Sequence, residues 1–153
     1  MIPGQNLGVP KSYDYALKMV KTKYMFNTQP DVSINENCIE ILLKSVKNYP
    51  NAAILSPIIF HEGKYSPDGD HKIFKLDKKN KLINKKFISM KNFYPDGDFS
   101  VDAVTGTAML IDVDKIKEIN GWDKNIFNYY EDMDLCIRLR QIGYEIVKIS
   151  NST

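Results

Sequence analysis

The chain has 153 residues, of which 43% are hydrophobic and 26% are charged. This length suits one domain, and the hydrophobic fraction is large enough to build a buried core. The 21 basic and 19 acidic residues nearly cancel, so the charge balance does not indicate a nucleic acid or an acidic membrane as a partner. Because no apolar run approaches ~18 residues and no charged-then-apolar leader is visible, we expect neither a membrane span nor a signal peptide.

The first third of the chain predicts two helices with a strand between them. Apolar residues recur at helical spacing over 10–20, with a proline near the first turn. Residues 23–27 are typical of a strand. The segment 33–36 has the spacing of a capping box and precedes a second helical pattern over 38–46. Asp31 is therefore expected in a turn between a strand and a helix.

The middle of the chain is predicted to be mostly irregular. Residues 52–55 and 57–60 are short apolar strand candidates. The lysine-rich segment 61–98 that follows predicts hairpins and loops, and its two Pro-Asp-Gly sequences, at 67–69 and 95–97, are typical of tight turns.

The last third predicts further strands and two helices. Thr105-Gly106-Thr107 interrupts the apolar run 101–111, and its glycine indicates a close approach of the backbone, either to a ligand or, as we expect, in a bulge of the sheet. A short helix is predicted over 114–119, a longer one over 131–142 and a final strand over 145–149. Alternating helices and strands predict an α/β fold with a mostly parallel sheet flanked by helices.

The two cysteines, Cys38 and Cys136, fall within helical apolar patterns, and neither belongs to a cluster of Cys and His ligands. This placement favours reduced thiols in the core over a disulfide. We therefore expect a cytoplasmic location, which includes the inner face of the membrane.

Asp31 follows a predicted strand, at the place where open α/β sheets bind their ligands. A carboxylate at that place can hold a divalent cation against a diphosphate. The pair Pro30-Asp31 is also common in turns, so the residues alone leave a purely structural role open.

Three carboxylates, Glu131, Asp132 and Asp134, lie at the start of the last predicted helix. Acidic residues are typical of helix N-termini, where each contributes about 0.3–1 kcal/mol through the free N–H groups and the helix dipole. At about 100° per residue, Asp134 shares the polar face with Arg138, whereas Asp132 lines up with the apolar face. A carboxylate on that face is either a structural cap or a general base that takes a proton from an acceptor hydroxyl.

Six segments occur in the same order as in a known family of enzymes. These segments, and the one that closes the pattern, are Asn6–Gly8, Gln29–Val32, Ala53–Pro57, Val101–Ile111, Asn120–Asp123, Tyr130–Arg140 and finally Gly143–Val147. Together they resemble the large family of inverting glycosyltransferases with the GT-A fold that includes bacterial rhamnosyltransferases. The resemblance implies that residues 1–153 form a partial GT-A domain, without the N-terminal nucleotide-binding strands and the C-terminal end of its relatives.

The resemblance also implies a metal ligand and a catalytic pair. Asp31 corresponds to the ligand for Mn²⁺ or Mg²⁺ in the DXD-type site of the family. Gln29 stands in place of the first acid of that pattern, which leaves Asp31 as the single carboxylate ligand. Glu131 and Asp132 correspond to the Glu-Asp pair of the family, in which Asp132 is the expected base.

Four further residues are implied in substrate binding by the same resemblance. Gly106 and Thr107 resemble the segment that lines the donor and acceptor pocket. Trp122 and Asp123 resemble the loop before the helix that carries the Glu-Asp pair.

The function implied by the resemblance is transfer of a sugar from a nucleotide-diphosphate sugar to a saccharide or lipid-linked saccharide in bacterial surface polysaccharide synthesis. The reaction would invert the anomeric configuration with assistance from a metal. The alternative is a catalytically inactive truncated fragment or a non-enzymatic interaction module, because nucleotide-binding strands are missing from the chain. Without them, the strand over 23–27 would form an exposed sheet edge, and we expect self-association.

Overall fold

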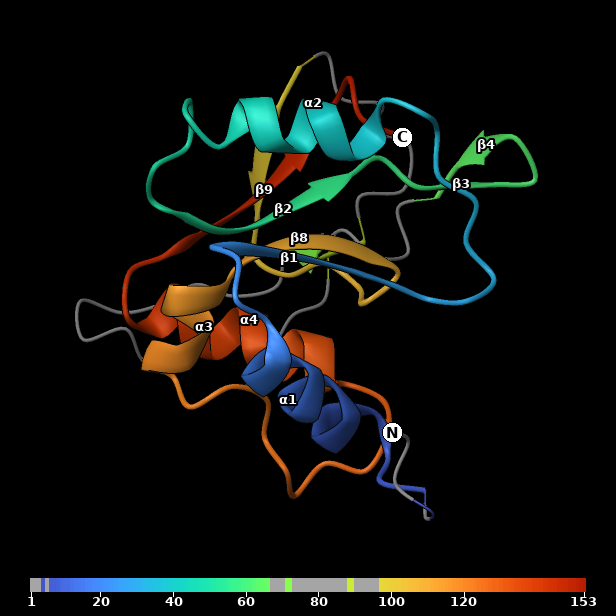
Figure 1. The fold of residues 1–153 in the computed structure, drawn as a ribbon. Coiled ribbons are helices and arrows are strands. Elements are labelled where there is room, and N and C mark those ends of the chain that lie inside the picture. Colours follow the sequence, from blue (N-terminus) through green and yellow to red (C-terminus); the bar gives the residue numbers. More distant parts are fainter. Residues whose placement is uncertain (1–3, 5, 67–70, 73–87, 90–96) are drawn as a thin grey trace.

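The computed structural model describes residues 4, 6–66, 71–72, 88–89 and 97–153. Its main sheet has five strands in the order β1-β8-β2-β9-β7 (Figure 1). They are β1 (Tyr24–Thr28), β2 (Ala52–Pro57), β7 (Phe99–Val101), β8 (Ala108–Asp112) and β9 (Glu145–Ile149). Two short antiparallel pairs of strands lie outside this sheet, β3 (Phe60–His61) with β4 (Lys64–Tyr65) and β5 (His71–Lys72) with β6 (Ile88–Ser89).

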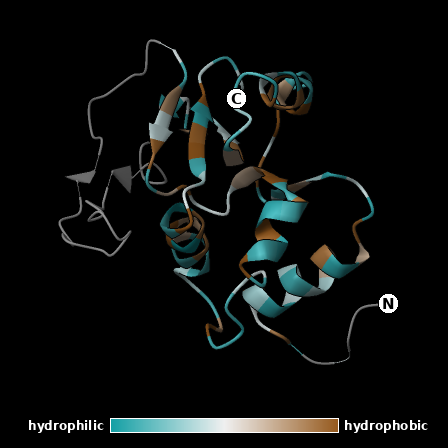
Figure 2. Ribbon diagram, turned by 90° about the vertical axis from the view of Figure 1, so that its left-hand side faces the viewer, coloured by the Kyte–Doolittle hydropathy of each residue, from teal (hydrophilic) through white to brown (hydrophobic). Residues whose placement is uncertain are grey.

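Helices cover both faces of the sheet, as predicted for an α/β fold. One face packs against α1 (Val9–Met19), α3 (Val113–Glu118) and α4 (Glu131–Gln141), and the other against α2 (Cys38–Ser45) (Figure 1). Figure 2 shows hydrophobic residues along the strands, whereas hydrophobic and hydrophilic residues alternate along the helices. The predicted helices over 10–20, 38–46, 114–119 and 131–142 and the strands over 23–27 and 145–149 are confirmed, with shifts of at most one residue at their ends.

The sheet is mixed, so the expectation of a mostly parallel sheet is wrong. β2 and β9 pair in parallel, whereas β8 is antiparallel to β1 and β2, and β7 is antiparallel to β9. The reason lies in the apolar run 101–111, which is neither one strand nor a bulge. β7 ends at Val101, residues 102–107 return without a helix, and β8 begins at Ala108. β1, β2 and β9 still point the same way, and their carboxyl ends share one edge of the sheet.

Two other local predictions are wrong. The strand expected over 57–60 is absent, because Pro57 still pairs with Ile149 at the end of β2 and Ile58 donates its N–H to the carbonyl of Ser152. The capping box before α2 does not form: the helix begins after Asn37, which makes no side-chain capping bond. The Pro-Asp-Gly turns lie outside the described residues, apart from Gly97.

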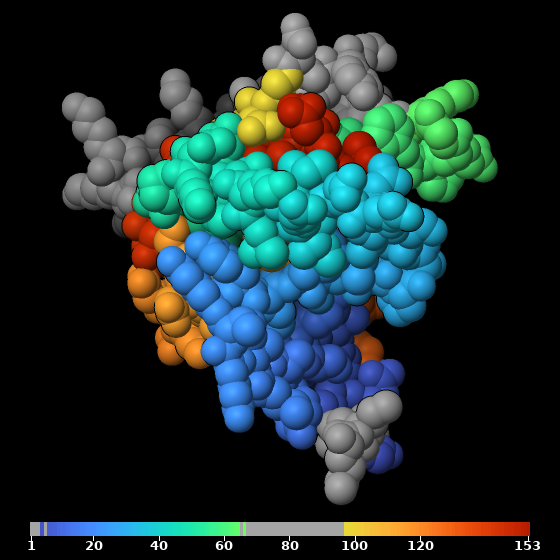
Figure 3. Space-filling model, turned by 45° about the horizontal axis from the view of Figure 1, so that its top comes forward, coloured from blue at the N-terminus to red at the C-terminus, as the bar shows by residue number. Residues whose placement is uncertain are grey.

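The C-terminal residues pack beside α2, which explains why the segment before that helix does not cap it. Asn35 donates its N–H to the carbonyl of Thr153 and also bonds the Thr153 hydroxyl. Ser152 donates its hydroxyl to the carbonyl of Cys38 at 3.1 Å. Figure 3 shows the C-terminal residues in red next to the cyan surface of α2.

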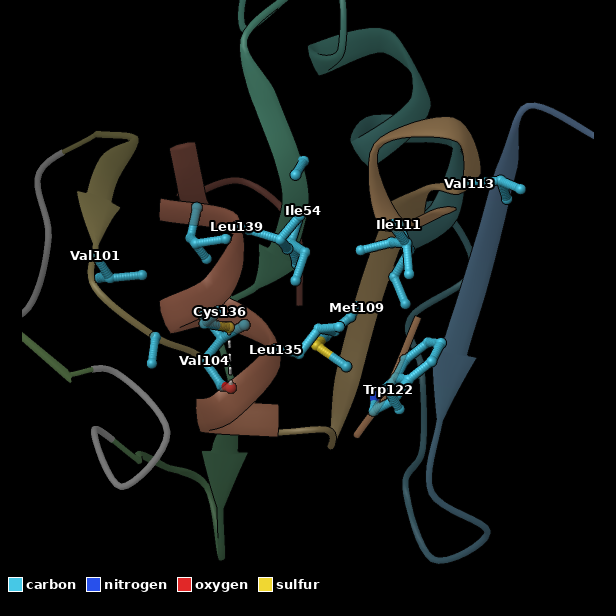
Figure 4. Close-up of a cluster of buried hydrophobic side chains, with 14 of the residues drawn as sticks. Ile54, Val101, Val104, Met109, Ile111, Val113, Trp122, Leu135, Cys136 and Leu139 are labelled. Atoms are coloured by element: carbon cyan, nitrogen blue, oxygen red, sulfur yellow. Dashed lines mark hydrogen bonds between the residues drawn. The ribbon is translucent and has the colours of Figure 1, made fainter. Parts of the chain in front are cut away.

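The core follows the period-two alternation of the strands. In β8, Met109 and Ile111 belong to the core beneath α1, α3 and α4, whereas Leu110 belongs to the core beneath α2. Figure 4 shows the first of these cores, in which Cys136 faces the carbonyl of Val104. Both cysteines are buried and free, as expected, and burial raises the pKa of the Cys136 thiol to about 12. Among the described helices, none has the length and apolar character needed to cross a bilayer.

Candidate active site

The return segment 102–107 runs along α4 and fixes the start of that helix against the sheet. Residues one turn apart on α4 meet alternate residues of the segment: Arg140 pairs with Asp102, the Cys136 thiol meets the carbonyl of Val104, and Asp132 accepts from the N–H of Gly106. Spacing of four residues on a helix and two on an extended chain keeps these contacts in line. The N-terminus of α4 is thereby held at the edge where β8 begins.

Gly106 is held from both sides. Its N–H donates to Asp132 Oδ2 at 2.8 Å, and its carbonyl accepts from Asn27 Nδ2 of β1 at 3.3 Å. A Cβ on Gly106 would lie 3.9 Å from Asp132 Oδ2, which is ordinary van der Waals contact. The close backbone approach that glycine suggested is therefore an approach to the Asp132 carboxylate, not a bulge in the sheet.

Asp132 is half-buried, and both of its oxygens accept backbone hydrogen bonds. Oδ1 accepts from the N–H of Met133 at 2.7 Å, and Oδ2 accepts from Gly106. Each carboxylate oxygen has a second lone pair, so the group can still accept a proton from a hydroxyl placed before it. Its orientation is fixed before any ligand arrives, which is what a positioned base requires.

Glu131 is the more buried member of the pair, although the helical wheel pointed to Asp132. The Glu131 side chain lies on the face of Leu135 and Leu139, and its Oε2 has no hydrogen-bond partner among the described residues. Burial, and to a lesser degree the charge of Asp132, raises the pKa of the Glu131 carboxyl above its usual value. The pair therefore combines an oriented carboxylate with one that holds its proton more tightly.

A raised pKa in the folded state makes stability depend on pH in a known direction. The folded protein binds the Glu131 proton more tightly than the unfolded chain, so this group stabilises the fold below the unfolded pKa of about 4.5. That contribution is lost as the pH rises through the folded pKa. We expect Glu131→Gln to remove this loss of stability, so that the unfolding free energies of the two proteins diverge as the pH rises above about 4.5 in urea titrations. Parallel profiles would contradict the burial of this carboxyl.

Asp31 lies in the exposed turn that follows β1, as predicted. The turn is tied to the return segment, because the N–H of Gln29 and the hydroxyl of Thr28 both donate to the carbonyl of Thr107, at 3.2 and 3.0 Å. Asp31 and the start of α4 are thereby placed around the same three-residue turn, Thr105–Thr107.

A cavity of about 700 Å³ opens between these elements. Its lining includes four of the predicted site residues, Asp31, Thr107, Glu131 and Asp132. A second hollow of about 550 Å³ borders it and shares Asp31 and Thr107. The cavity lies beyond the carboxyl end of β1, and the second hollow reaches the carboxyl end of β2 at Pro57. This edge is where α/β sheets bind their ligands.

Trp122 and Asp123 are not brought to this cavity. Trp122 is buried in the core, where its ring packs against Tyr13 with centroids 5.3 Å apart (Figure 4). Asp123 accepts bonds from the backbone N–H and the side-chain amide of Asn125 at 2.9 Å, which shapes the turn before α4. Trp122 therefore lies behind Tyr13, and it is Tyr13 that lines the cavity.

Sequence reasoning missed several residues of the site. Asn27, which holds Gly106, is a polar residue buried in an otherwise apolar strand, and that contrast is a usable signal. Tyr129 and Tyr130 line the cavity directly before the Glu-Asp pair. Both have positive φ, 66° and 65°, a conformation that tyrosine seldom adopts and that local sequence does not predict.

The cavity offers few side chains that could bind a metal ion. Among the described residues, no group of three or more His, Cys, Asp and Glu side chains is placed to hold an ion. Asp31 and the side-chain carbonyl of Gln29 are hard oxygen donors at one cavity, and such donors suit Mg²⁺ or Mn²⁺. They fit a cation that takes most of its oxygens from a diphosphate and water.

No family model matches the chain. The chain is 38% identical over 64 residues to the rhamnosyltransferase WbbL of Escherichia coli (strain K12), a match that covers 42% of this chain and 24% of that protein. The chain thus matches about a quarter of the length of this curated relative.

The fold is similar to that of GalNAc-T7, solved with UDP, GalNAc and Mn²⁺, with a TM-score of 0.70 at 11% sequence identity. This similarity covers 97% of the present chain and 30% of the GalNAc-T7 chain. The fold similarity shows that the chain has the fold of a GT-A glycosyltransferase. The sequence match to a rhamnosyltransferase covers less than half of the chain.

Proposed function

We propose that residues 1–153 form part of a GT-A domain that transfers a sugar from a nucleotide-diphosphate sugar to a saccharide or lipid-linked saccharide acceptor. The observation that carries the proposal is the meeting of Asp31 with Glu131 and Asp132 around one cavity. An acid that can hold a cation against a diphosphate and an oriented carboxylate are the two groups that such a transfer needs. The similarity to a bacterial rhamnosyltransferase supports the transfer of a sugar, and the proposed place of this transfer is bacterial surface polysaccharide synthesis.

In the proposed reaction, Asp132 accepts the proton of an acceptor hydroxyl as the oxygen attacks the anomeric carbon. The bond from that carbon to the nucleotide diphosphate breaks on the opposite side, so the configuration inverts. The Gly106 N–H holds the carboxylate in place, and burial raises the pKa of the neighbouring Glu131 carboxyl above its usual value. A bound Mn²⁺ or Mg²⁺ would neutralise the departing diphosphate.

The metal is expected to bind at Asp31 only when a nucleotide diphosphate is present, since one carboxylate is a poor site for a hard cation. Calorimetry of the protein as its gene encodes it, with Mn²⁺ alone and with Mn²⁺ and UDP, tests this. Asp31→Asn should abolish the UDP-dependent binding, whereas Glu36→Gln, an exposed acid in the same connection, should not change it. Tight binding of Mn²⁺ without UDP would show that further ligands exist.

A non-enzymatic interaction module is the second candidate, and the position of β1 favours it. Within the described sheet, β1 pairs with β8 on one side and forms the edge on the other. Unpaired strand edges invite association with another chain. Self-association without any acceleration of sugar transfer would support this candidate over the enzyme.

A further inference from the structure

The segment before α4 exposes three aromatic side chains next to the proposed catalytic pair. Phe127, Tyr129 and Tyr130 are 61%, 75% and 71% exposed. Tyr129 and Tyr130 line the same cavity as Glu131 and Asp132. Large exposed apolar side chains that gather at one place are typical of a binding surface.

Helix stability does not explain these tyrosines. Tyr129 and Tyr130 are consecutive residues with φ near +65°, a conformation that favours glycine and asparagine. Tyr130 is also the N-cap of α4 and makes no side-chain capping bond, although Ser, Thr, Asp or Asn would stabilise that position. Residues that break local rules in this way are expected where function requires them.

A smaller hollow continues the cavity along this aromatic segment. It has a volume of about 270 Å³ and is lined by Phe127. It shares Val9, Tyr13 and Asn128 with the larger cavity. Its volume lies below the ~300–1,000 Å³ of a complete ligand site, so it is an extension of the first cavity.

We propose that Phe127, Tyr129 and Tyr130 form an acceptor platform that binds a saccharide of at least two units. A sugar ring has an apolar face of C–H groups and a rim of hydroxyls, which suits aromatic rings beside polar groups such as the Asn128 amide. The first unit lies on Tyr129 and Tyr130, with a hydroxyl toward Asp132. The second unit lies on Phe127 in the smaller hollow. This orientation rests on the proposed function of Asp132.

Binding to the protein as its gene encodes it tests the platform without requiring turnover. The probes are methyl glycosides of hexoses and 6-deoxyhexoses and the disaccharides built from them, titrated by NMR. We expect at least one disaccharide to bind about tenfold more tightly than either of its units. A tenfold difference in Kd corresponds to about 1.4 kcal/mol of binding free energy. Phe127→Ala should remove this difference and leave monosaccharide affinity unchanged, whereas Phe127→Tyr should keep it.

Tyr129→Asn separates binding from folding. Asparagine tolerates positive φ, so this variant should melt no lower than the original protein while it loses affinity for both sizes of saccharide. Tyr15→Ala, which removes an exposed tyrosine of α1 outside both hollows, should leave binding unchanged. The platform is wrong if no saccharide binds, if Phe127→Ala weakens both sizes equally or neither, or if Tyr129→Asn binds normally.

The same titrations distinguish failure of the platform from failure of the proposed function. Saccharide binding that depends on Phe127 but comes without transfer would refute the enzyme and retain the platform. Transfer that depends on Asp132 but is insensitive to Phe127 would refute the platform and retain the enzyme.

Discussion

Asp132→Asn is expected to lower kcat by about 10²-fold or more, the usual effect of losing a general base, with donor affinity nearly unchanged. The amide has nearly the size of the carboxylate but cannot accept the hydroxyl proton. Because only the transition state needs that proton transfer, kcat and kcat/KM should fall together. Steady-state rates of the gene-encoded protein, with a titration of the donor, measure both effects.

The substitution also lowers the stability of the fold, and the experiment must separate this effect from the loss of the base. Asp132 accepts from Gly106 and Met133 through different oxygens, and an amide retains only one of them. Loss of one such bond is expected to lower the unfolding free energy by about 0.5–1.5 kcal/mol, which is less than the usual stability of a domain.

Asp134→Asn provides the matched control for this experiment. Asp134 lies on the same helix, pairs with Arg138 at 2.7 Å and is absent from the cavity lining. Its replacement should lower stability by a similar amount and leave kcat unchanged. Activity of Asp132→Asn within about tenfold of the original protein would refute the assignment of the base.

Sequence periodicity was a good guide wherever one face of an element is buried. α1 and α4 have helical spacing of apolar residues, and both were predicted nearly to their ends. The helical wheel placed Asp134 and Arg138 on one face, and the two side chains form an ion pair in the structure. In these helices one face is buried and the other is exposed, so the local sequence contains the information.

The run 101–111 could not be interpreted in this way, because two different neighbours bury it. Val101 and Ala108 belong to strands, whereas Ala103 and Val104 are buried within the return segment, which packs against α4. An apolar residue indicates that its side chain is buried, but it does not indicate which element of the fold buries it. The mixed sheet and the position of Gly106 depend on that segment, so both escaped prediction.

The candidate site was predicted in its parts but not in its assembly. Asp31 and the Glu-Asp pair were identified from their order along the chain, and the cavity that they share requires the turn at Thr105–Thr107 between them. Trp122 was expected near the substrate from the family resemblance, whereas its side chain is buried in the core, as its size favours. Tyr129 and Tyr130 have positive φ, which tyrosine seldom adopts, so residue propensities could not predict this conformation.

The aromatic segment also depends on a glycine at the other end of the chain, which leads to the second large expected effect. Gly8, the N-cap of α1, has φ 75° and ψ 170°, a backbone region that is essentially confined to glycine. A Cβ on Gly8 would lie 2.5 Å from the carbonyl oxygen of Phe127, and that oxygen accepts the N–H of Val9 at 3.0 Å. A backbone atom cannot move aside as the end of a flexible side chain can.

Gly8→Ala is therefore expected to lower the unfolding free energy by about 2–4 kcal/mol, the sum of backbone strain and a displaced loop. Gly63→Ala is the matched control, because Gly63 has a similar φ of 73° and nothing within 4 Å of its Cβ position. It should cost only the strain, about 1 kcal/mol. Urea unfolding of the three proteins measures the difference. Equal costs would mean that Gly8 does not support the loop of Phe127, whereas a larger cost for Gly8→Ala, together with weaker saccharide binding, would link the start of α1 to the acceptor platform.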